Sequence, residues 1–257
     1  MGGTTDAEIK DYLNSHPIPK ILSTYDSIYR MNRFIKDKSD WRLVMDEFHV
    51  LLGDAAMKSE TEMKVLKIAR SYPYVTFMSA TPIEQEFLLE IEELKDLPYY
   101  EVMWEEKEMV YVDRQKHAKP LNAALGIVKN YMAGNFASRL DENGNRIYSK
   151  ECVIFLNSVK TIISIIKQSG VRPEQVNIIM GQSEDNDKLL EKECPRFHRG
   201  HVPTREEKNK MITFCTSTAY AGCDFYSDSA STFVICDCSK KNTSVDISTE
   251  LVQIAGR

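Results

Sequence analysis

The most informative part of the sequence is Trp41-Arg42-Leu43-Val44-Met45-Asp46-Glu47-Phe48-His49. Its first five residues form a short apolar run of the kind that makes a buried β-strand, and two carboxylates follow that run directly. The carboxyl ends of parallel strands form the edge at which α/β proteins bind their ligands. The sequence therefore predicts that Asp46 and Glu47 lie together at the ligand-binding edge of a parallel sheet.

Apolar runs of similar length recur along the chain and alternate with segments of helical periodicity. This alternation predicts an α/β fold in which helices cover both faces of parallel sheets. The periodicity weakens between residues 96 and 120, so we place a domain boundary there and divide the chain into 1–108 and 109–257. Further strands are expected at 20–24, 75–78, 152–156, 176–180, 211–215 and 232–236.

Three pairs of residues have the spacing of a helix-capping box, in which a hydroxyl is followed three residues later by a glutamate. They predict helix starts at Ser59, Thr81 and Thr204, and Pro82 suits the first helical position after Thr81. Gly170 is expected to end the helix that follows the strand at 152–156. The polar residues 141–145 are expected to form a surface turn.

The composition is that of a globular protein, with 42% hydrophobic and 28% charged residues. No apolar run approaches the roughly 18 residues that span a bilayer, so no membrane partner is expected. Six cysteines, several of them in predicted strands, are expected to be free thiols in a cytoplasmic or nuclear setting. The net charge of −5 divides into −8 for residues 1–108 and +3 for 109–257, so the basic excess lies in the second half.

The pair Asp46-Glu47 has a common structural interpretation, because acidic residues after a strand often start a helix. Phosphoryl transfer, however, needs one carboxylate to hold Mg²⁺ and a second to orient or deprotonate water. Ser79-Ala80-Thr81 also follows a predicted strand, so its hydroxyls are expected at the same sheet edge. A capping role for Thr81 leaves Ser79 available for a second role.

Five blocks, in order along the chain, resemble the motifs of superfamily 2 helicases of the DEAD/DEAH type. Asp46-Glu47-Phe48-His49 is similar to their Walker B box, in a DEFH variant, and Ser79-Ala80-Thr81 is similar to motif III. The blocks similar to motifs IV, V and VI are residues 155–158, 217–225 and 253–257. The resemblance implies two RecA-like parallel-sheet lobes, the first incomplete at its N-terminus, in 1–108 and 109–257.

The resemblance also implies roles for single residues. Asp46 would bind Mg²⁺, Glu47 would be the catalytic base, and His49 would link the nucleotide site to the other lobe. Ser79 and Thr81 would couple hydrolysis to strand movement. In the second lobe, Gln253 and Arg257 would be catalytic and act on the γ-phosphate, while Gly222 and Asp224 would bind the nucleotide. Ser158 and Thr218 would contact the backbone of single-stranded DNA or RNA.

The family's phosphate-binding loop needs glycine-rich backbone followed by Gly-Lys-Ser/Thr. None of the eleven glycines of this chain is followed by lysine. We therefore expect a fragment of a larger ATP-dependent helicase or translocase, with further domains in the full-length protein. ATP and Mg²⁺ belong to the complete motor; neither is expected to bind tightly to this chain, which is expected to have no appreciable ATPase activity alone.

Cys194, His198 and His201 are three candidate zinc ligands, but a structural site needs four, so no zinc is expected. The two histidines, with Arg196, Arg199 and Arg205, are candidates for phosphate contacts instead. The alternative function is a non-hydrolysing nucleic-acid or protein interaction module with a degenerate helicase fold. A third hypothesis keeps the motor as the translocating subunit of a restriction or replication-initiation assembly.

Overall fold

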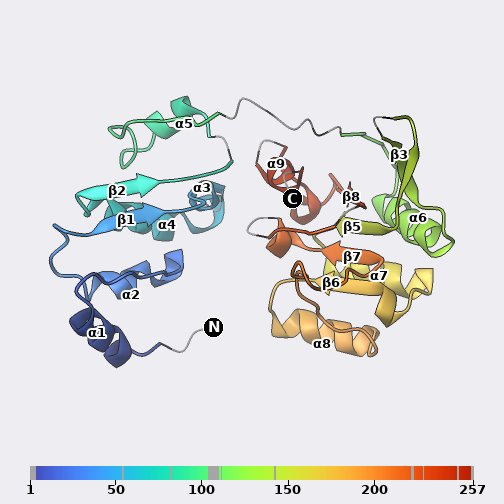
Figure 1. The fold of residues 1–257 in the computed structure, drawn as a ribbon, viewed down its shortest axis with the longest axis horizontal. Coiled ribbons are helices and arrows are strands. Elements are labelled where there is room, and N and C mark those ends of the chain that lie inside the picture. Colours follow the sequence, from blue (N-terminus) through green and yellow to red (C-terminus); the bar gives the residue numbers. More distant parts are fainter. Residues whose placement is uncertain are drawn as a thin grey trace. The chain divides into compact units, whose positions relative to one another are not determined.

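The computed structural model describes residues 4–53, 55–81, 83–103, 110, 112–141, 143–220, 223–227, 229–247 and 249–255. The chain divides into two compact units, Met1–Glu105 (unit 1) and Glu106–Arg257 (unit 2) (Figure 1). The boundary predicted after residue 108 falls within 104–109, outside the described residues. Both units mix helices with parallel strands, so the α/β class is confirmed.

Unit 1 is built around two parallel strands, β1 and β2, which pair in register from Arg42↔Tyr74 to Met45↔Phe77. The predicted strands at 41–45 and 75–78 therefore form: the first begins one residue later than predicted, and the second begins and ends one residue earlier. The elements of unit 1 are α1 (Asp6–Ser15), η1 (Tyr25–Ser27), α2 (Ile28–Asn32), β1 (Arg42–Met45), α3 (His49–Gly53), α4 (Ala55–Arg70), β2 (Tyr74–Phe77) and α5 (Gln85–Leu89).

The two faces of this small sheet differ. Met45 packs with Leu66 and Ala69 of α4 in a buried cluster, since alternate side chains of a strand point to opposite faces. On the other face Val44 and Tyr74 are more than half exposed, with relative exposures of 56% and 55%. The helices described in unit 1 thus bury one face of β1–β2 and leave the apolar residues of the other face accessible.

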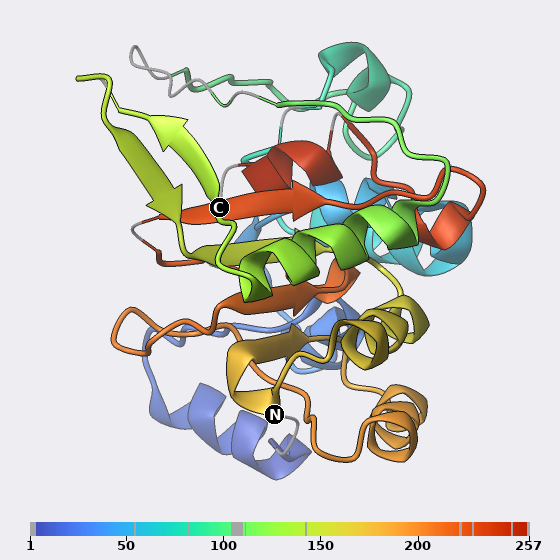
Figure 2. The same cartoon turned by 90° about the vertical axis from the view of Figure 1, so that its right-hand side faces the viewer.

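Unit 2 contains a four-stranded parallel sheet with the order β6-β7-β5-β8 and an antiparallel hairpin, β3–β4. The helix α6 lies along one face of the sheet (Figure 2). The elements of unit 2 are α6 (Pro120–Met132), β3 (Ala137–Leu140), β4 (Arg146–Ser149), β5 (Glu151–Phe155), α7 (Val159–Ser169), η2 (Pro173–Gln175), β6 (Val176–Ile179), α8 (Glu184–Glu193), β7 (Ile212–Cys215), η3 (Ser217–Ala219), β8 (Ala230–Val234), η4 (Lys241–Thr243) and α9 (Glu250–Ala255).

Both faces of the four-stranded sheet are buried. Ile154 and Phe214, each 0% exposed, face a large cluster that includes residues of α6, α7 and α8. Their chain neighbours Phe155 and Cys215 face a second cluster that includes Ile254 of α9. Burial on both sides explains why these strands are continuous apolar runs in the sequence rather than alternating ones.

Local features of unit 2 follow from its helix and turn residues. Ser158 caps α7 by accepting a hydrogen bond from the Thr161 N–H, and Gly170 ends α7 with φ 70°. The turn at 141–145 forms as predicted, because the Asp141 carboxylate accepts hydrogen bonds from the Asn143 and Asn145 N–H groups. At Gly200 a Cβ would lie 1.8 Å from Asn177 Oδ1, so this position admits only glycine without rearrangement.

Several predicted helix starts are wrong. The helix expected from Ser59 is α4, which already begins at Ala55. Alanine has the highest helix propensity, so the helix extends toward the N-terminus beyond the predicted start. The helix expected from Thr81 is α5, which begins only at Gln85 with Glu84 as its N-cap, and Pro82 lies outside the described residues. After Thr204 no helix forms before β7; the Glu207 carboxylate only accepts the Thr204 N–H across a turn, at 2.7 Å.

Two strand predictions are also corrected. Within the described ranges, residues 20–24 pair with no strand, because the Lys20 backbone instead exchanges hydrogen bonds with the Tyr12 hydroxyl and Leu22 is fully exposed. The last strand, β8, spans Ala230–Val234 rather than 232–236, so Ile235 and Cys236 follow the strand instead of ending it. Apolar composition alone did not separate a solvent-exposed extended segment from a paired strand.

Candidate functional site

The segments that follow β1 and β2 remain side by side beyond the ends of the strands. The Met78 N–H donates to the Met45 carbonyl at 2.8 Å, and the Phe48 N–H donates to the Met78 carbonyl at 3.0 Å. These two bonds continue the pairing at the carboxyl edge of the sheet. They place Asp46 and Glu47 beside the segment that carries Ser79, as the sequence predicted.

The backbone turns sharply at Glu47. This residue has φ 52°, the only positive φ of a non-glycine residue in the described parts of the chain. A left-handed conformation costs an L-residue about 1–2 kcal/mol. The Glu47 N–H donates to Asp46 Oδ1 at 3.0 Å, and the Tyr25 hydroxyl donates to the Asp46 carbonyl, so the turn is held from both sides. Strain of this kind is concentrated at functional sites.

His49 joins the two segments. Its side chain is 8% exposed, and its Nδ1 lies 2.8 Å from Ser79 Oγ and 3.2 Å from Glu47 Oε2. Ser79 Oγ donates its single proton to the Thr81 carbonyl at 2.9 Å and accepts the Thr81 N–H at 3.1 Å. His49 Nδ1 must therefore carry the proton that bonds Ser79, which assigns the Nδ1–H tautomer.

Two effects shift the pKa of His49 in opposite directions. Burial lowers the pKa of its imidazole, while the carboxylates of Glu47 and Asp46 act to raise it, and burial has the larger effect. The imidazole is therefore neutral at pH 7, and its Nδ1 lies 3.2 Å from Glu47 Oε2 without forming an ion pair of two full charges. His49 is a connection between Glu47 and Ser79 that does not require protonation.

One oxygen of the Glu47 carboxylate can still accept a hydrogen bond or bind a cation. Its Oε2 is buried and accepts no hydrogen bond from the described residues; His49 Nδ1 is near but not at a bonding angle. A buried acceptor without a partner is a place where water or a ligand is expected. Asp46 is exposed beside it. This pair of carboxylates suits Mg²⁺, a hard cation that is commonly held through one or two carboxylates and several waters.

The carboxyl edge of β1–β2 does not suit a nucleoside triphosphate. Backbone N–H groups of a glycine-rich loop and a lysine are needed to hold the phosphates, and neither accompanies Asp46 and Glu47 in this sequence. The described residues thus fit the metal and the water of a phosphoryl-transfer site and do not fit its phosphates.

Two of the residues predicted in unit 2 lie at the carboxyl edge of its own sheet. Ser158 follows β5, and its hydroxyl is engaged in capping α7 and in accepting from the Thr161 hydroxyl. Thr218, in η3, is exposed, and its Oγ1 lies 2.9 Å from where a Cβ on Gly181 would stand. Both lie where sequence analysis predicted, although only Thr218 presents an exposed side chain.

The nucleotide-binding residues predicted in unit 2 are described only in part. Asp224 is exposed, and Gln253 lies half-buried on α9, where its N–H donates to the Thr249 carbonyl at 3.0 Å. Gly222 and Arg257 lie outside the described residues. Their roles, like those of Asp224 and Gln253, stay predictions.

Two functional candidates were missed by sequence reasoning. Tyr25 holds the Asp46 carbonyl, and burial followed by the charges of Asp46 and Glu47 raises the pKa of its phenol to about 12. Asn157 bonds both Asn242 and Ser217, which lie 85 and 60 residues away. Neither contact has a local pattern; the only available hint was that Asn157 lies directly before Ser158 in the block similar to motif IV.

The basic segment at 196–205 is largely engaged within the chain. Arg199 pairs with Asp187 at 3.5 Å, His201 pairs with Glu207 at 3.0 Å, and Arg205 lies over the Tyr226 ring. These contacts reduce the number of side chains in the segment that remain available to bind phosphates.

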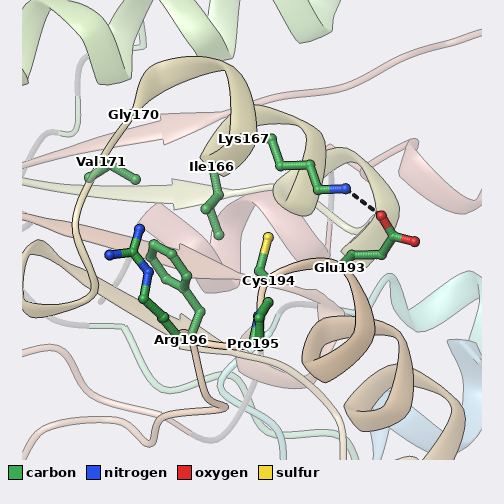
Figure 3. A pocket seen from close by; sticks show the side chains of 9 residues that line it. Ile166, Lys167, Gly170, Val171, Glu193, Cys194, Pro195 and Arg196 are labelled. Carbon is green, nitrogen blue, oxygen red and sulfur yellow. Dashed lines mark hydrogen bonds and ion pairs between the residues drawn. The ribbon is translucent and has the colours of Figure 1, made fainter.

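A hollow of about 250 Å³ lies between the end of α7 and the end of α8. Figure 3 shows the Cys194 thiol pointing into it, beside the ion pair between Lys167 and Glu193. Burial raises the pKa of this thiol, so Cys194 is a protonated core cysteine. Across the described ranges, no three His, Cys, Asp or Glu side chains lie together as a metal site.

No protein-family model, curated protein or solved structure matches this chain. In the described part of the chain, every helix is too short or too polar to cross a bilayer. The interpretation of the site therefore rests on the residues and their geometry.

Proposed function

We propose that this chain is part of a cytoplasmic or nuclear nucleic-acid helicase or translocase that is driven by nucleotide hydrolysis. The observation that carries the proposal is the contact of His49 with both Ser79 Oγ at 2.8 Å and Glu47 Oε2 at 3.2 Å. This contact joins two sequence blocks, separated by 30 residues, that were assigned to the same motor by resemblance alone. If Asp46, Glu47 and Thr81 served only to start helices, this contact between the two blocks would not be needed.

In this proposal the two units are RecA-like lobes with different tasks. Asp46 would hold Mg²⁺, and Glu47, whose Oε2 accepts no hydrogen bond from the described residues, would orient and deprotonate the attacking water. His49 transmits the position of Glu47 to Ser79 and Thr81. Unit 2 carries the residues predicted to act on the nucleotide, which are Gly222, Asp224, Gln253 and Arg257, and those predicted for the nucleic-acid backbone, which are Ser158 and Thr218.

The metal site can be tested without nucleotide turnover. Substoichiometric Mn²⁺, as a paramagnetic substitute for Mg²⁺, is added to the ¹⁵N-labelled chain, and broadening of amide resonances is measured. We expect the amides of Asp46, Glu47 and His49 to broaden first, and Asp46→Asn to abolish this preference. The matched control is Asp11→Asn, an exposed aspartate of α1 in the same unit. Broadening centred on other carboxylates, with no change in Asp46→Asn, would contradict the proposal.

Nucleotide hydrolysis provides the second measurement. Because the phosphate-binding residues are lacking, the chain alone is expected to release no phosphate from ATP above the level of buffer. Metal-dependent turnover that Glu47→Gln abolishes would show that the chain itself hydrolyses nucleotide and that our expectation of inactivity is wrong. A chain that shows neither a metal preference at Asp46 nor binding to single strands would favour the interaction module instead.

A further inference from the structure

The hollow between the ends of α7 and α8 lies away from the sheet edge that carries Ser158 and Thr218. Both helices begin after the carboxyl end of a strand, α7 after β5 and α8 after β6. Because the strands are parallel, each helix returns toward their amino ends before the next strand begins. The hollow lies where the two helices end. A binding site there is separate from the residues of the proposed motor.

The walls of this hollow include apolar side chains of the packed core. Ile166 of α7, Val171 after α7 and Phe197 after α8 are 3%, 4% and 7% exposed, and all three belong to the large buried cluster of unit 2. Gly170 also lines the hollow, and a Cβ at this position would meet no atom within 4 Å. The hollow is therefore a preformed apolar space that a small molecule can enter without displacing core side chains.

The Cys194 thiol is a second feature of the hollow, because it points into the apolar space (Figure 3). Cys194 is 6% exposed, and burial raises the pKa of its thiol, so the sulfur is protonated and uncharged. A polarisable sulfur makes favourable contacts with aromatic rings. The thiol therefore favours an aromatic ligand over an aliphatic one of the same size.

The charges around the hollow nearly cancel. Lys167 and Glu193 form an ion pair on one side of it, and Arg196 lies on the opposite side (Figure 3). Arg196 is exposed and has no ion-pair partner among the described residues. Its positive charge lies beside the C-terminal ends of α7 and α8, and a helix C-terminus carries roughly half a negative charge. This balance favours an uncharged ligand over an anion or a cation.

We propose that the hollow is a binding site for a small uncharged compound with one substituted aromatic ring. The ring packs against the apolar walls, contacts the Cys194 sulfur and lies against the Arg196 guanidinium, which is attracted to the face of an aromatic ring. A cavity of about 150 Å³ accommodates benzene, so the 250 Å³ of this hollow admits a ring and its substituent. An aliphatic compound of the same size would use the apolar walls alone.

The test compares benzyl alcohol with cyclohexylmethanol, which are both uncharged and similar in size, although only the first is aromatic. Each is titrated into the ¹⁵N-labelled whole chain, and saturable shifts of the Gly170, Val171 and Phe197 amides are measured. We expect benzyl alcohol to bind more tightly, whereas burial of apolar surface alone would favour cyclohexylmethanol. Arg196→Gln should weaken benzyl alcohol binding by about two- to fivefold and leave cyclohexylmethanol binding unchanged. Arg139→Gln, at an exposed arginine of β3, is the matched control and should change neither.

Alkylation by iodoacetamide locates the bound ring. At alkaline pH, where part of the buried thiol ionises, benzyl alcohol should slow the alkylation of Cys194 and leave that of the exposed Cys238 unchanged, as followed by mass spectrometry of peptides. Benzyl alcohol that binds no more tightly than cyclohexylmethanol, or that leaves the alkylation rate of Cys194 unchanged, would overturn the proposal. So would a Cys194 that does not react in the unliganded chain, because the hollow would then admit no small molecule. These outcomes leave the proposed function untouched, since its metal site is in unit 1.

Discussion

Both units are built on a parallel sheet, but they differ in how much of that sheet is buried. Unit 2 buries both faces of a four-stranded parallel sheet, whereas the described part of unit 1 buries one face of a two-stranded sheet and leaves Val44 and Tyr74 accessible on the other. Parallel sheets are ordinarily covered on both faces. Yet the strained Glu47 and the buried His49 are both in unit 1. Unit 2 therefore has the more extensive packing, whereas the candidate catalytic residues lie in unit 1.

The largest expected effect comes from the core of unit 2. Phe214→Ala removes a side chain that is 0% exposed, which costs about 3–5 kcal/mol because the cavity collapses only in part. Hydrogen exchange followed by mass spectrometry should show loss of protection throughout β5–β8. Peptides that cover β1 and β2 should keep their exchange rates, since the units are separate compact bodies.

The control for this experiment is Tyr148→Ala on the β3–β4 hairpin. Tyr148 is 52% exposed, so its removal should change stability by about 0.5 kcal/mol or less. Equal loss of protection in both units on Phe214→Ala would mean that they unfold as one, and the contrast between them would lose its basis.

The same contrast explains what the sequence predicted. Strands β5, β6 and β7 were located within one residue, because burial on both faces gives continuous apolar runs such as Val176–Ile179. The adjacency of Asp46 and Ser79 followed from the rule that parallel strands end at one edge. The strand at 20–24 and the helix after Thr204 failed because each rested on a local pattern that tertiary contacts overrode.

The contacts that define the site were beyond local patterns. The hydrogen bonds of Tyr25 to Asp46 and of Asn157 to Asn242 span 21 and 85 residues, and nothing near either residue specifies its partner. The positive φ of Glu47 was also unpredictable, because left-handed backbone usually selects glycine, asparagine or aspartate. Sequence reasoning found which residues gather at the edge and missed what holds them there.

A smaller effect is expected at the turn itself. Glu47→Gly removes the cost of left-handed backbone and should stabilise unit 1 by about 1 kcal/mol, while it abolishes the base and weakens the Mn²⁺ response of the neighbouring Asp46. Glu47→Ala is the matched control, since it deletes the carboxylate and keeps the strain. Chemical denaturation followed by exchange of β1–β2 peptides distinguishes the two. If glycine is no more stable than alanine, the backbone at Glu47 is not strained and the functional interpretation of that turn loses support.

The smallest effect concerns the pH dependence of unit 1. Burial lowers the folded-state pKa of His49 below the ordinary value of 6.5, so the unfolded chain binds a proton more readily than the folded one. The stability that this difference confers is present above pH 6.5 and is lost as the pH falls through the folded pKa. The protection factors of β1–β2 peptides, which take account of the slower intrinsic exchange at lower pH, should therefore fall between neutral and mildly acidic pH in the unaltered chain. In His49→Gln, whose amide can still donate to Ser79 Oγ, this fall in protection should disappear, whereas His16→Gln, an exposed histidine of the same unit, should retain it. An identical pH profile in His49→Gln would show that burial does not lower the pKa of this imidazole in the folded chain.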